Sequence, residues 1–503
     1  MRYGNLRGAG SKSSLRSRIG SIAVGALIGF ALLPGMSPAQ AAEPEFDLVL
    51  RHGRVIDPES GLDAVRDVGI RQGTIAAVSD HPLRGRVTID VDGLAVAPGF
   101  IDLHQHAQQS EDYRLKAQDG VTTVCELEVG TADVDAWYAA REGKALIHFG
   151  VSVGHIPCRM AAMGDRPGFL PGADSATALQ PASDAQLAEV TRLIEHGFAR
   201  GAVAVGLGLQ YTPASTMAET LAVYRVAAKY HASCHVHLRS KGDSGPRNVF
   251  TAIQELIDAS NATGAPSHVC HVQSTSNRAT PRALQQISDA RSRGTDISVE
   301  CYPYTAGMTE IKSAVFDPGW QARAGIDFQD LQWAATGERL TAETFANYRQ
   351  TGGLVIVHSN PEEVVRAAVS HPLTMIASDG LRGHPRHAGT SARILGRYVR
   401  EEQVITLAQA IDKLSLMPAR RLEARVPAMK RKGRVQVGAD ADLVVFDPKT
   451  VGDRATYEKP DLASVGIPYV LVAGVLVVRD GLVQTEVNPG QAVRAKFEGG
   501  NRD

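Results

Sequence analysis

Between residues 97 and 427, short apolar runs alternate with longer stretches of helical pattern. Residues 121–124 and 201–209 are two of the apolar runs, and residues 184–199 and 246–259 are two of the helical stretches. Such alternation over about 330 residues is typical of βα units that close into a parallel barrel. We therefore predict an α/β chain in which residues 97–427 form a TIM-like (β/α)8 barrel.

Two β-rich blocks flank this region. Residues 46–96 and 441–474 contain short alternating runs separated by Gly and Asp, a pattern that favours antiparallel strands with tight turns. Blocks from opposite ends of a chain can pair into one domain. We predict a small discontinuous β-sandwich domain built from residues 42–96 and 428–490.

The first 41 residues have the pattern of a signal peptide. They contain five basic residues and no acidic one, then an apolar run at 19–33 and the small-residue motif Ala39-Gln40-Ala41. The alternative is an uncleaved membrane anchor, but a run of about 15 residues is short for a span of roughly 20. We predict cleavage after Ala41, export to the periplasm or secretion, and no stable membrane association of the mature chain.

The charge composition argues against one class of partner, and the cysteine content argues against one class of fold. Lys and Arg together number 53 and Asp and Glu 54, so no basic excess indicates nucleic-acid binding. The five cysteines are sparse and odd in number, which argues against a disulfide framework. We expect a small-molecule substrate, and the sequence leaves the oligomeric state open.

Residues able to bind a metal follow most of the predicted barrel strands. The carboxyl ends of barrel strands meet at one face, where active sites lie. His104 and His106 face the same way, because side chains alternate along a strand. The other strand ends carry, in chain order, Glu126 and Glu128, His155, His235 and His237, His268 and His271, Glu300, and Asp379.

Imidazoles combined with carboxylates suit Zn²⁺ or a similar divalent cation. Such a cation lowers the pKa of bound water to about 7 and so supplies hydroxide at neutral pH. Asp379, at the last strand, is placed to move the proton of that water. The pattern predicts metal-assisted hydrolysis. A lone His is more often structural, and His148, His196, His231 and His371 take that interpretation.

Further motifs surround these residues. The most specific is His384-Pro385-Arg386, followed by Gly389-Thr390 and residues 393–399. The others are residues 98–106, 120–124, 153–155, 206–213, 237–239, 267–271, 302–306, 378–381 and 438–447. At these positions, over about residues 46–485, the chain resembles the amidohydrolase superfamily, and within it the N-acyl-D-amino-acid deacylases (D-aminoacylases).

The resemblance implies a set of metal ligands. His237 and His271 match ligands of one tightly held metal ion. His104, His106 and Asp379 match ligands of a second, weaker site, and Asp379 also matches the general base and acid. Within their own runs, His235 and His268 are the alternatives, for which a structural or supporting role is favoured.

The chain departs from the family at the bridging ligand. The family has a metal-binding Cys at the end of the second strand, where this chain has Val129. Other amidohydrolases use a carboxylated Lys on the fourth strand, but residues 201–209 contain no Lys, Glu or Cys. Glu126 and Glu128 share one face of the second strand. We predict that Glu128, nearer the strand end, is the bridging ligand, and that Glu126 supports the site from behind.

The resemblance also implies substrate contacts. Family deacylases bind the substrate carboxylate with an Arg, a Tyr and a Lys, and here Arg386 and Tyr304 match. The Lys position is occupied by Gln273, so the pocket has one positive charge fewer. His155, in the motif that ends the third strand, is a further candidate substrate contact.

We therefore predict an exported, metal-dependent hydrolase of linear amide bonds. Its expected substrates are N-acyl amino acids, with D configuration favoured, or related carboxylated amides. The alternatives are a cyclic-amide hydrolase of the hydantoinase or dihydroorotase kind, a dipeptide hydrolase, and a barrel that only binds its ligand. The last is disfavoured because the chain keeps four candidate His ligands and Asp379.

Overall fold

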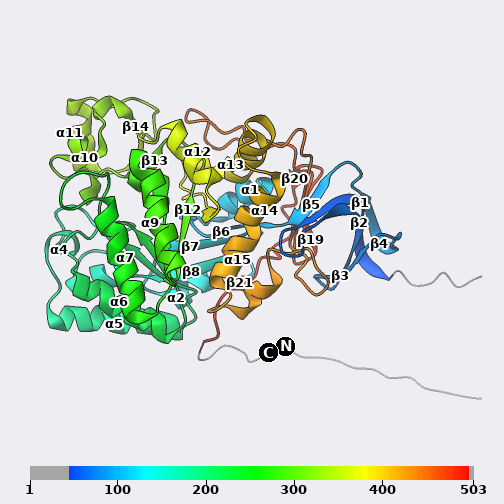
Figure 1. The fold of residues 1–503 in the computed structure, drawn as a ribbon, viewed down its shortest axis with the longest axis horizontal. Helices are drawn as coiled ribbons and strands as arrows, with labels where there is room; N and C mark the ends of the chain where they lie inside the picture. Colours follow the sequence, from blue (N-terminus) through cyan, green and yellow to red (C-terminus); the bar gives the residue numbers. More distant parts are fainter. Residues whose placement is uncertain (1–44, 498–503) are drawn as a thin grey trace, which may run out of the picture. The chain divides into compact units, whose positions relative to one another are not determined.

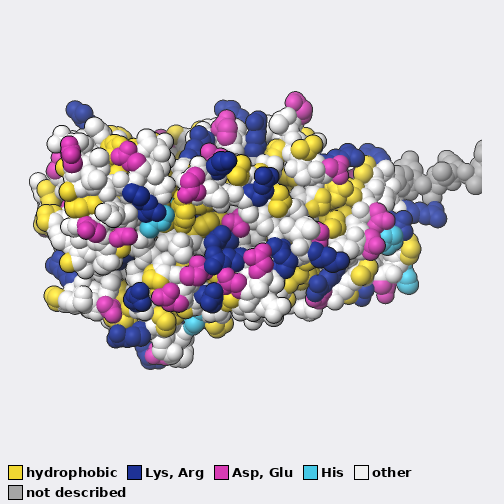
Figure 2. Space-filling view, turned by 90° about the horizontal axis from the view of Figure 1, so that it is seen from above, with side chains coloured by type: hydrophobic (Ala, Val, Ile, Leu, Met, Phe, Trp, Pro, Cys, Tyr) yellow, Lys and Arg dark blue, Asp and Glu magenta, His cyan; other side chains and the backbone are white. Residues whose placement is uncertain are grey.

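The computed structural model describes residues 45–497 (Figure 1). The predicted signal peptide, residues 1–41, lies outside the described residues. Within them, no helix has the length and apolar character needed to cross a membrane. Figure 2 shows Lys and Arg side chains interspersed with Asp and Glu on the face in view, in keeping with the balanced composition.

A parallel sheet of nine strands lies at the centre of the described region, and eight of them form the barrel. The first and last strands are linked by a parallel bridge between Gln105 and Gly380, which brings the barrel close to closure. The predicted barrel is therefore confirmed. Its strands are β6 (Phe100–Asp102), β7 (Val121–Thr131), β8 (His148–Gly154), β9 (Val205–Gly208), β10 (Cys234–His237), β11 (Ser267–Val269), β12 (Ile297–Cys301) and β16 (Thr374–Ile376).

Helices follow the strands and cover the outside of the barrel (Figure 1). Several begin at a side chain that caps the free backbone N–H groups: Ser183 accepts from Gln186, and Asn248 accepts from Thr251. Their apolar faces pack into one core with the outer faces of the strands. The main covering helices are α1 (Ser110–Gln118), α3 (His155–Met163), α5 (Asp184–Ala199), α6 (Met217–Lys229), α7 (Val249–Thr263), α9 (Thr280–Ser292), α12 (Glu362–Ser370) and α13 (Arg386–Arg393).

Both ends of the described chain build a second sheet. The antiparallel pairing of β17 with β5 joins the C-terminal strands to the N-terminal ones. This confirms a β unit made from both ends. It is one mixed sheet, because β1 pairs parallel with β4 and β5. Its strands are β1 (Phe46–Asp57), β2 (Leu62–Arg71), β3 (Thr74–Ser79), β4 (Gly85–Asp90), β5 (Ala95–Pro98), β17 (Leu443–Phe446), β18 (Tyr469–Val472), β19 (Val475–Arg479) and β20 (Leu482–Val483). The domain boundaries themselves stay predictions.

A three-stranded antiparallel sheet lies between β12 and β16 in the sequence. It consists of β13 (Gly307–Glu310), β14 (Leu331–Trp333) and β15 (Leu354–Val357), and α10 (Trp320–Ala324) and α11 (Ala342–Thr351) accompany it. It has its own cluster of aromatic and aliphatic side chains, with Trp320 and Trp333 among them. The sequence analysis did not foresee this insertion, and it supplies one wall of the cavity described next.

Candidate active site

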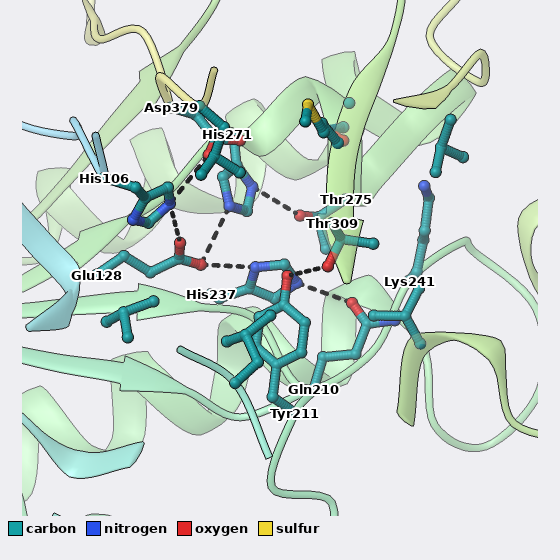
Figure 3. Close-up of a pocket in the computed structure, with 18 of the residues that line it drawn as sticks. His106, Glu128, Gln210, Tyr211, His237, Lys241, His271, Thr275, Thr309 and Asp379 are labelled. Carbon is teal, nitrogen blue, oxygen red and sulfur yellow. Dashed lines mark hydrogen bonds and ion pairs between the residues drawn. The ribbon is translucent and has the colours of Figure 1, made fainter. Parts of the chain in front are cut away.

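Glu128 lies at the centre of a buried cluster at the carboxyl ends of the barrel strands (Figure 3). Its two oxygens face two different pairs of imidazoles. Oε2 lies 2.8 Å from His104 Nε2 and 3.4 Å from His106 Nε2. Oε1 lies 2.7 Å from His237 Nδ1 and 3.3 Å from His271 Nε2. One carboxylate thus connects two potential metal positions.

Asp379 completes the first of these positions. Its Oδ1 lies 3.2 Å from His106 Nε2 and 3.5 Å from His104 Nε2. Asp379 has a φ of 50° and His271 a φ of 30°, values that residues with a Cβ rarely adopt. Such backbone strain is concentrated at functional sites. The surrounding fold therefore holds these two side chains against a local conformational preference.

The donor atoms fit a divalent cation. His104 Nδ1 lies 2.5 Å from Glu300 Oε1, and His106 Nδ1 lies 2.5 Å from Glu126 Oε2. An imidazole that donates its Nδ1–H to a carboxylate keeps a lone pair on Nε2. The two Nε2 atoms are 3.2 Å apart and face carboxylate oxygens. Against the effect of burial, these carboxylates raise the pKa of both imidazoles, so a bound cation would take the place of the Nε2 protons.

The second position has the same character. His237 Nε2 donates to Gln210 Oε1 at 2.8 Å, which leaves the Nδ1 lone pair facing Glu128. The ligand atoms of Glu128, His237 and His271 lie within 4.8 Å of one another, as do those of the first group. Imidazole and carboxylate donors in this number match zinc sites.

The charges of the cluster depend on one another. Burial alone would raise the pKa of Glu128, but the imidazoles of His104 and His237 bring it well below its ordinary value. Burial also opposes ionisation of Asp379, yet Arg386 and then His104 lower its pKa. Both carboxylates are therefore held as anions, the form that binds a metal. Burial lowers the pKa of His237, which favours its neutral, ligating form.

The three residues predicted to bind the substrate carboxylate do not line the cavity over Glu128. Arg386 is fully buried and its Nη1 lies 2.8 Å from Asp379 Oδ2. Tyr304 donates its hydroxyl to the carbonyl of Pro385, whereas its neighbour Tyr302 lines the cavity. Gln273 is buried and donates to the carbonyl of Tyr302. Their roles in substrate binding stay predictions.

His155 does not line the cavity over Glu128. It begins α3, and its Nε2 lies 2.8 Å from Glu219 Oε1. Arg159 also pairs with this carboxylate, at 2.6 Å. In the structure His155 thus belongs to a buried ion-pair network, which gives no support to a substrate contact.

Glu300 is a member of the site that the sequence analysis noted at a strand end but to which it gave no role. It lies on β12, and its two oxygens contact His104 Nδ1 and, at 2.9 Å, His268 Nε2. His268 and its neighbour His235 therefore lie behind the metal positions. The only sequence signal for Glu300 is a carboxylate inside an apolar strand, which needs a partner when buried.

Comparison with known proteins agrees with this geometry. The sequence profile of the Amidohydrolase family matches residues 87–478. The chain belongs to the amidohydrolase family. N-acyl-D-glutamate deacylase of Alcaligenes xylosoxydans xylosoxydans is 31% identical to this amidohydrolase over 490 residues, which cover 86% of this chain and 94% of that protein. D-aminoacylase of the same organism is 28% identical over 488 residues, with 87% and 95% covered.

Solved structures place the amidohydrolase in the same group. N-acyl-D-glutamate deacylase of Bordetella bronchiseptica, in complex with zinc and a phosphonate mimic of the tetrahedral intermediate, superposes with a TM-score of 0.75. The two are 29% identical, and the match covers 90% of this chain and all of that one. A D-aminoacylase with a binuclear metal centre has a TM-score of 0.76 at 26% identity over the same shares. The predicted resemblance is confirmed, and this amidohydrolase is a metal-dependent hydrolase of the D-aminoacylase type.

Proposed function

We propose that this amidohydrolase hydrolyses the amide bond of N-acyl-D-amino acids and releases a carboxylic acid and a free D-amino acid. The observation that carries the proposal is the division of the Glu128 oxygens between two imidazole pairs, with Asp379 beside them. Two of the proteins to which the chain is similar are named for the deacylation of N-acyl-D-glutamate and N-acyl-D-aspartate, and a third is named D-aminoacylase. Both lines support the same chemistry.

The cluster would hold one or two divalent ions, with zinc the best match. His237, His271 and Glu128 would bind the more tightly held ion. His104, His106, Asp379 and the second oxygen of Glu128 would bind the weaker one. When bound, a divalent ion polarises the amide carbonyl and makes a water molecule more acidic.

Asp379 carries the proton in this mechanism. Its carboxylate accepts a proton from the attacking water and delivers it to the leaving nitrogen, which departs as an amine. Arg386 pairs with Oδ2 and so keeps Oδ1 turned toward the histidine cluster. Glu300 and Glu126 hold His104 and His106 in one tautomer and orientation.

Arg386 also has hydrogens to offer the substrate. Its Nε group is buried without a hydrogen-bond acceptor in the described structure, whereas Nη1 faces the carboxylate of Asp379. Its guanidinium lies 4.6 Å from the centre of the Tyr302 ring, which borders the cavity. We place the substrate α-carboxylate against Arg386. Tyr304 holds the carbonyl of Pro385, the residue before Arg386, and Gln273 holds the carbonyl of Tyr302, whose ring faces the guanidinium.

A substrate panel tests the proposal. Zinc-loaded enzyme should hydrolyse N-acetyl-D-amino acids faster than their L-enantiomers, and faster than hydantoin, dihydroorotate or a dipeptide. Metal analysis of the same sample reports whether the cluster is loaded. Faster turnover of a cyclic amide by metal-loaded enzyme would overturn the deacylase assignment while leaving the metal-dependent hydrolase intact.

We also propose that the chain is exported and that its signal peptide is removed. The basic start, the apolar run at 19–33 and Ala39-Gln40-Ala41 support this. N-terminal sequencing of the protein from its native cell should begin near Ala42. An intact Met1 on the accumulated protein would contradict the proposal.

A further inference from the structure

Lys241 follows β10 and borders the cavity over Glu128. Among the described residues that line this cavity, it is the one Lys or Arg side chain. The carboxylates of Glu128 and Asp379, which also line the cavity, already face histidines, among them His106. Arg386 lies behind Asp379 and is not part of the lining. Lys241 is therefore the one lysine or arginine charge that borders the cavity itself.

The ammonium of Lys241 has fewer hydrogen-bond acceptors than it has hydrogens to donate. It donates to Ser359 Oγ at 3.3 Å, and the described structure gives it no other hydrogen bond and no ion pair within 4.0 Å. An ammonium has three hydrogens to donate. Its near neighbour Arg239, in contrast, pairs with Glu255 at 2.8 Å. Burial lowers the pKa of Lys241 to about 8, which still leaves the group mainly protonated at neutral pH.

Lys241 lies on the opposite side of the cavity from Glu128 (Figure 3). His237 and Gln210 lie between the two in this view. The amide that is cleaved must sit beside Glu128 and Asp379, and the α-carboxylate is attached close to that amide. A group that reaches Lys241 must therefore be at the far end of the substrate, on its side chain or at the end of its acyl group.

We propose that Lys241 binds a second carboxylate of the substrate, remote from the scissile amide. The preferred substrates would then be dianionic N-acyl amino acids, with one carboxylate near Arg386 and the other on Lys241. This inference rests on the proposed deacylase function. Gln273, where the lysine of the family is missing, does not line this cavity, so the charge of Lys241 lies at a different place.

Paired substrates test this without confusing charge with size. N-acetyl-D-glutamate is compared with N-acetyl-D-glutamine, and N-succinyl-D-alanine with N-butyryl-D-alanine. The readout is the ratio of kcat/KM for the charged and neutral members of each pair. Lys241→Met should lower this ratio at least about tenfold in one pair, since a charge-assisted hydrogen bond is lost. Lys241→Arg should keep most of the ratio.

The pair that responds identifies which end of the substrate carries the second carboxylate. Lys229→Met is the matched control, because that lysine is exposed on α6 and pairs with Glu195. Thermal unfolding of each variant checks that the fold is retained. An unchanged ratio in both pairs for folded Lys241→Met would overturn the inference.

A binding experiment separates failure of the inference from failure of the proposed function. If the wild-type enzyme hydrolyses none of the four substrates, the deacylase function fails. Calorimetric titration with glutarate and with butyrate then tests the carboxylate site without turnover. Tighter binding of glutarate that disappears in Lys241→Met supports the site. Equal effects of the variant on both ligands overturn it.

Discussion

Arg386 Nη1 lies 2.8 Å from Asp379 Oδ2, and both side chains are almost fully buried. The pair couples a residue expected to bind substrate with the residue expected to move the proton. The two oxygens of Asp379 therefore have different partners, because Oδ2 faces Arg386 whereas Oδ1 faces His106 and His104. An arginine in this position lowers the pKa of Asp379 and, in the proposed function, also binds the substrate carboxylate.

Removing this arginine should shift the pH dependence of turnover. Asp379 acts as a base only in its carboxylate form, and Arg386 lowers its pKa. Arg386→Gln should therefore move the acidic limb of the kcat/KM profile upward, by about 1–3 pH units. Arg393→Gln is the control, because Arg393 lies on the same helix but pairs with Asp453. Identical acidic limbs for wild type and Arg386→Gln would argue against the coupling.

The same variant tests the contact with substrate. If Arg386 binds the α-carboxylate, Arg386→Gln should raise KM more for N-acetyl-D-amino acids than for the corresponding amides. The reason is that a guanidinium binds a carboxylate through parallel charge-assisted hydrogen bonds, and a glutamine cannot. Equal increases for acids and amides would leave Arg386 with its role at Asp379 alone.

Glu128 and Glu126 should differ in their effect on metal content. Glu128→Gln replaces a bridging carboxylate by a neutral amide and should lower both metal content and activity sharply. Glu126 contacts the outer nitrogen of His106, so Glu126→Gln should cost about 10–100-fold in affinity or activity. Elemental analysis and measurement of kcat on the same samples test both expectations. Full metal in Glu128→Gln, with loss in Glu126→Gln, would reverse the two assignments.

Asp379→Asn should nearly abolish turnover while the fold survives. The two side chains have almost the same volume, but an amide does not accept a proton from water. General acid–base groups contribute about 10²–10⁴-fold, and kcat should fall by that factor. Circular dichroism checks the fold. Near-normal kcat across the pH range would remove Asp379 from the proton-transfer role.

Glu300→Gln should weaken metal binding without touching a metal ligand directly. Glu300 orients His104 from behind, at 2.5 Å from Nδ1. Loss of such a partner typically costs about 10–100-fold in metal affinity. Competition with a chelator measures this, and Glu300→Asp reports whether charge alone suffices. Unchanged affinity in Glu300→Gln would make the contact purely structural.

The junction between barrel and mixed sheet should be sensitive to Asp442. This buried carboxylate lies 3.0 Å from His148 Nε2 and 2.6 Å from Lys432 Nζ. Asp442→Asn leaves Lys432 with weaker pairing and should lower the free energy of unfolding by about 3–5 kcal/mol. Asp63→Asn, which breaks an exposed pair with Arg54, should cost about 0–1 kcal/mol. Urea denaturation compares the two.

The pH dependence of this effect has a definite sign. The pKa of Asp442 in the folded protein is held far below its ordinary value of 3.8, by His148 and Lys432 against the effect of burial. Its stabilising contribution is therefore complete above pH 3.8 and is lost as the pH falls. The difference between wild type and Asp442→Asn should shrink at acidic pH. A constant difference would indicate that packing, rather than charge, is responsible.

The barrel and the centre of its site could be predicted from the amino-acid sequence. Strand–helix alternation limits the fold class, and the carboxyl ends of barrel strands must meet at one face. His104, His106, His237, His271 and Asp379 therefore come together wherever the loops run. The two-residue period of a strand likewise turned Glu126 and Glu128 to the same side.

The surroundings of that centre could not be predicted, because they depend on long-range packing. The positions of Arg386, Gln273 and His155 depend on how loops and helix starts pack, which no local period encodes. The same holds for Glu300, whose partner His104 is 196 residues away in the sequence. Lys241 could not be placed either, because an unpaired charge becomes visible only when every neighbouring side chain is known. Local patterns specify where strands end, whereas long-range packing specifies which charges are left to bind a substrate.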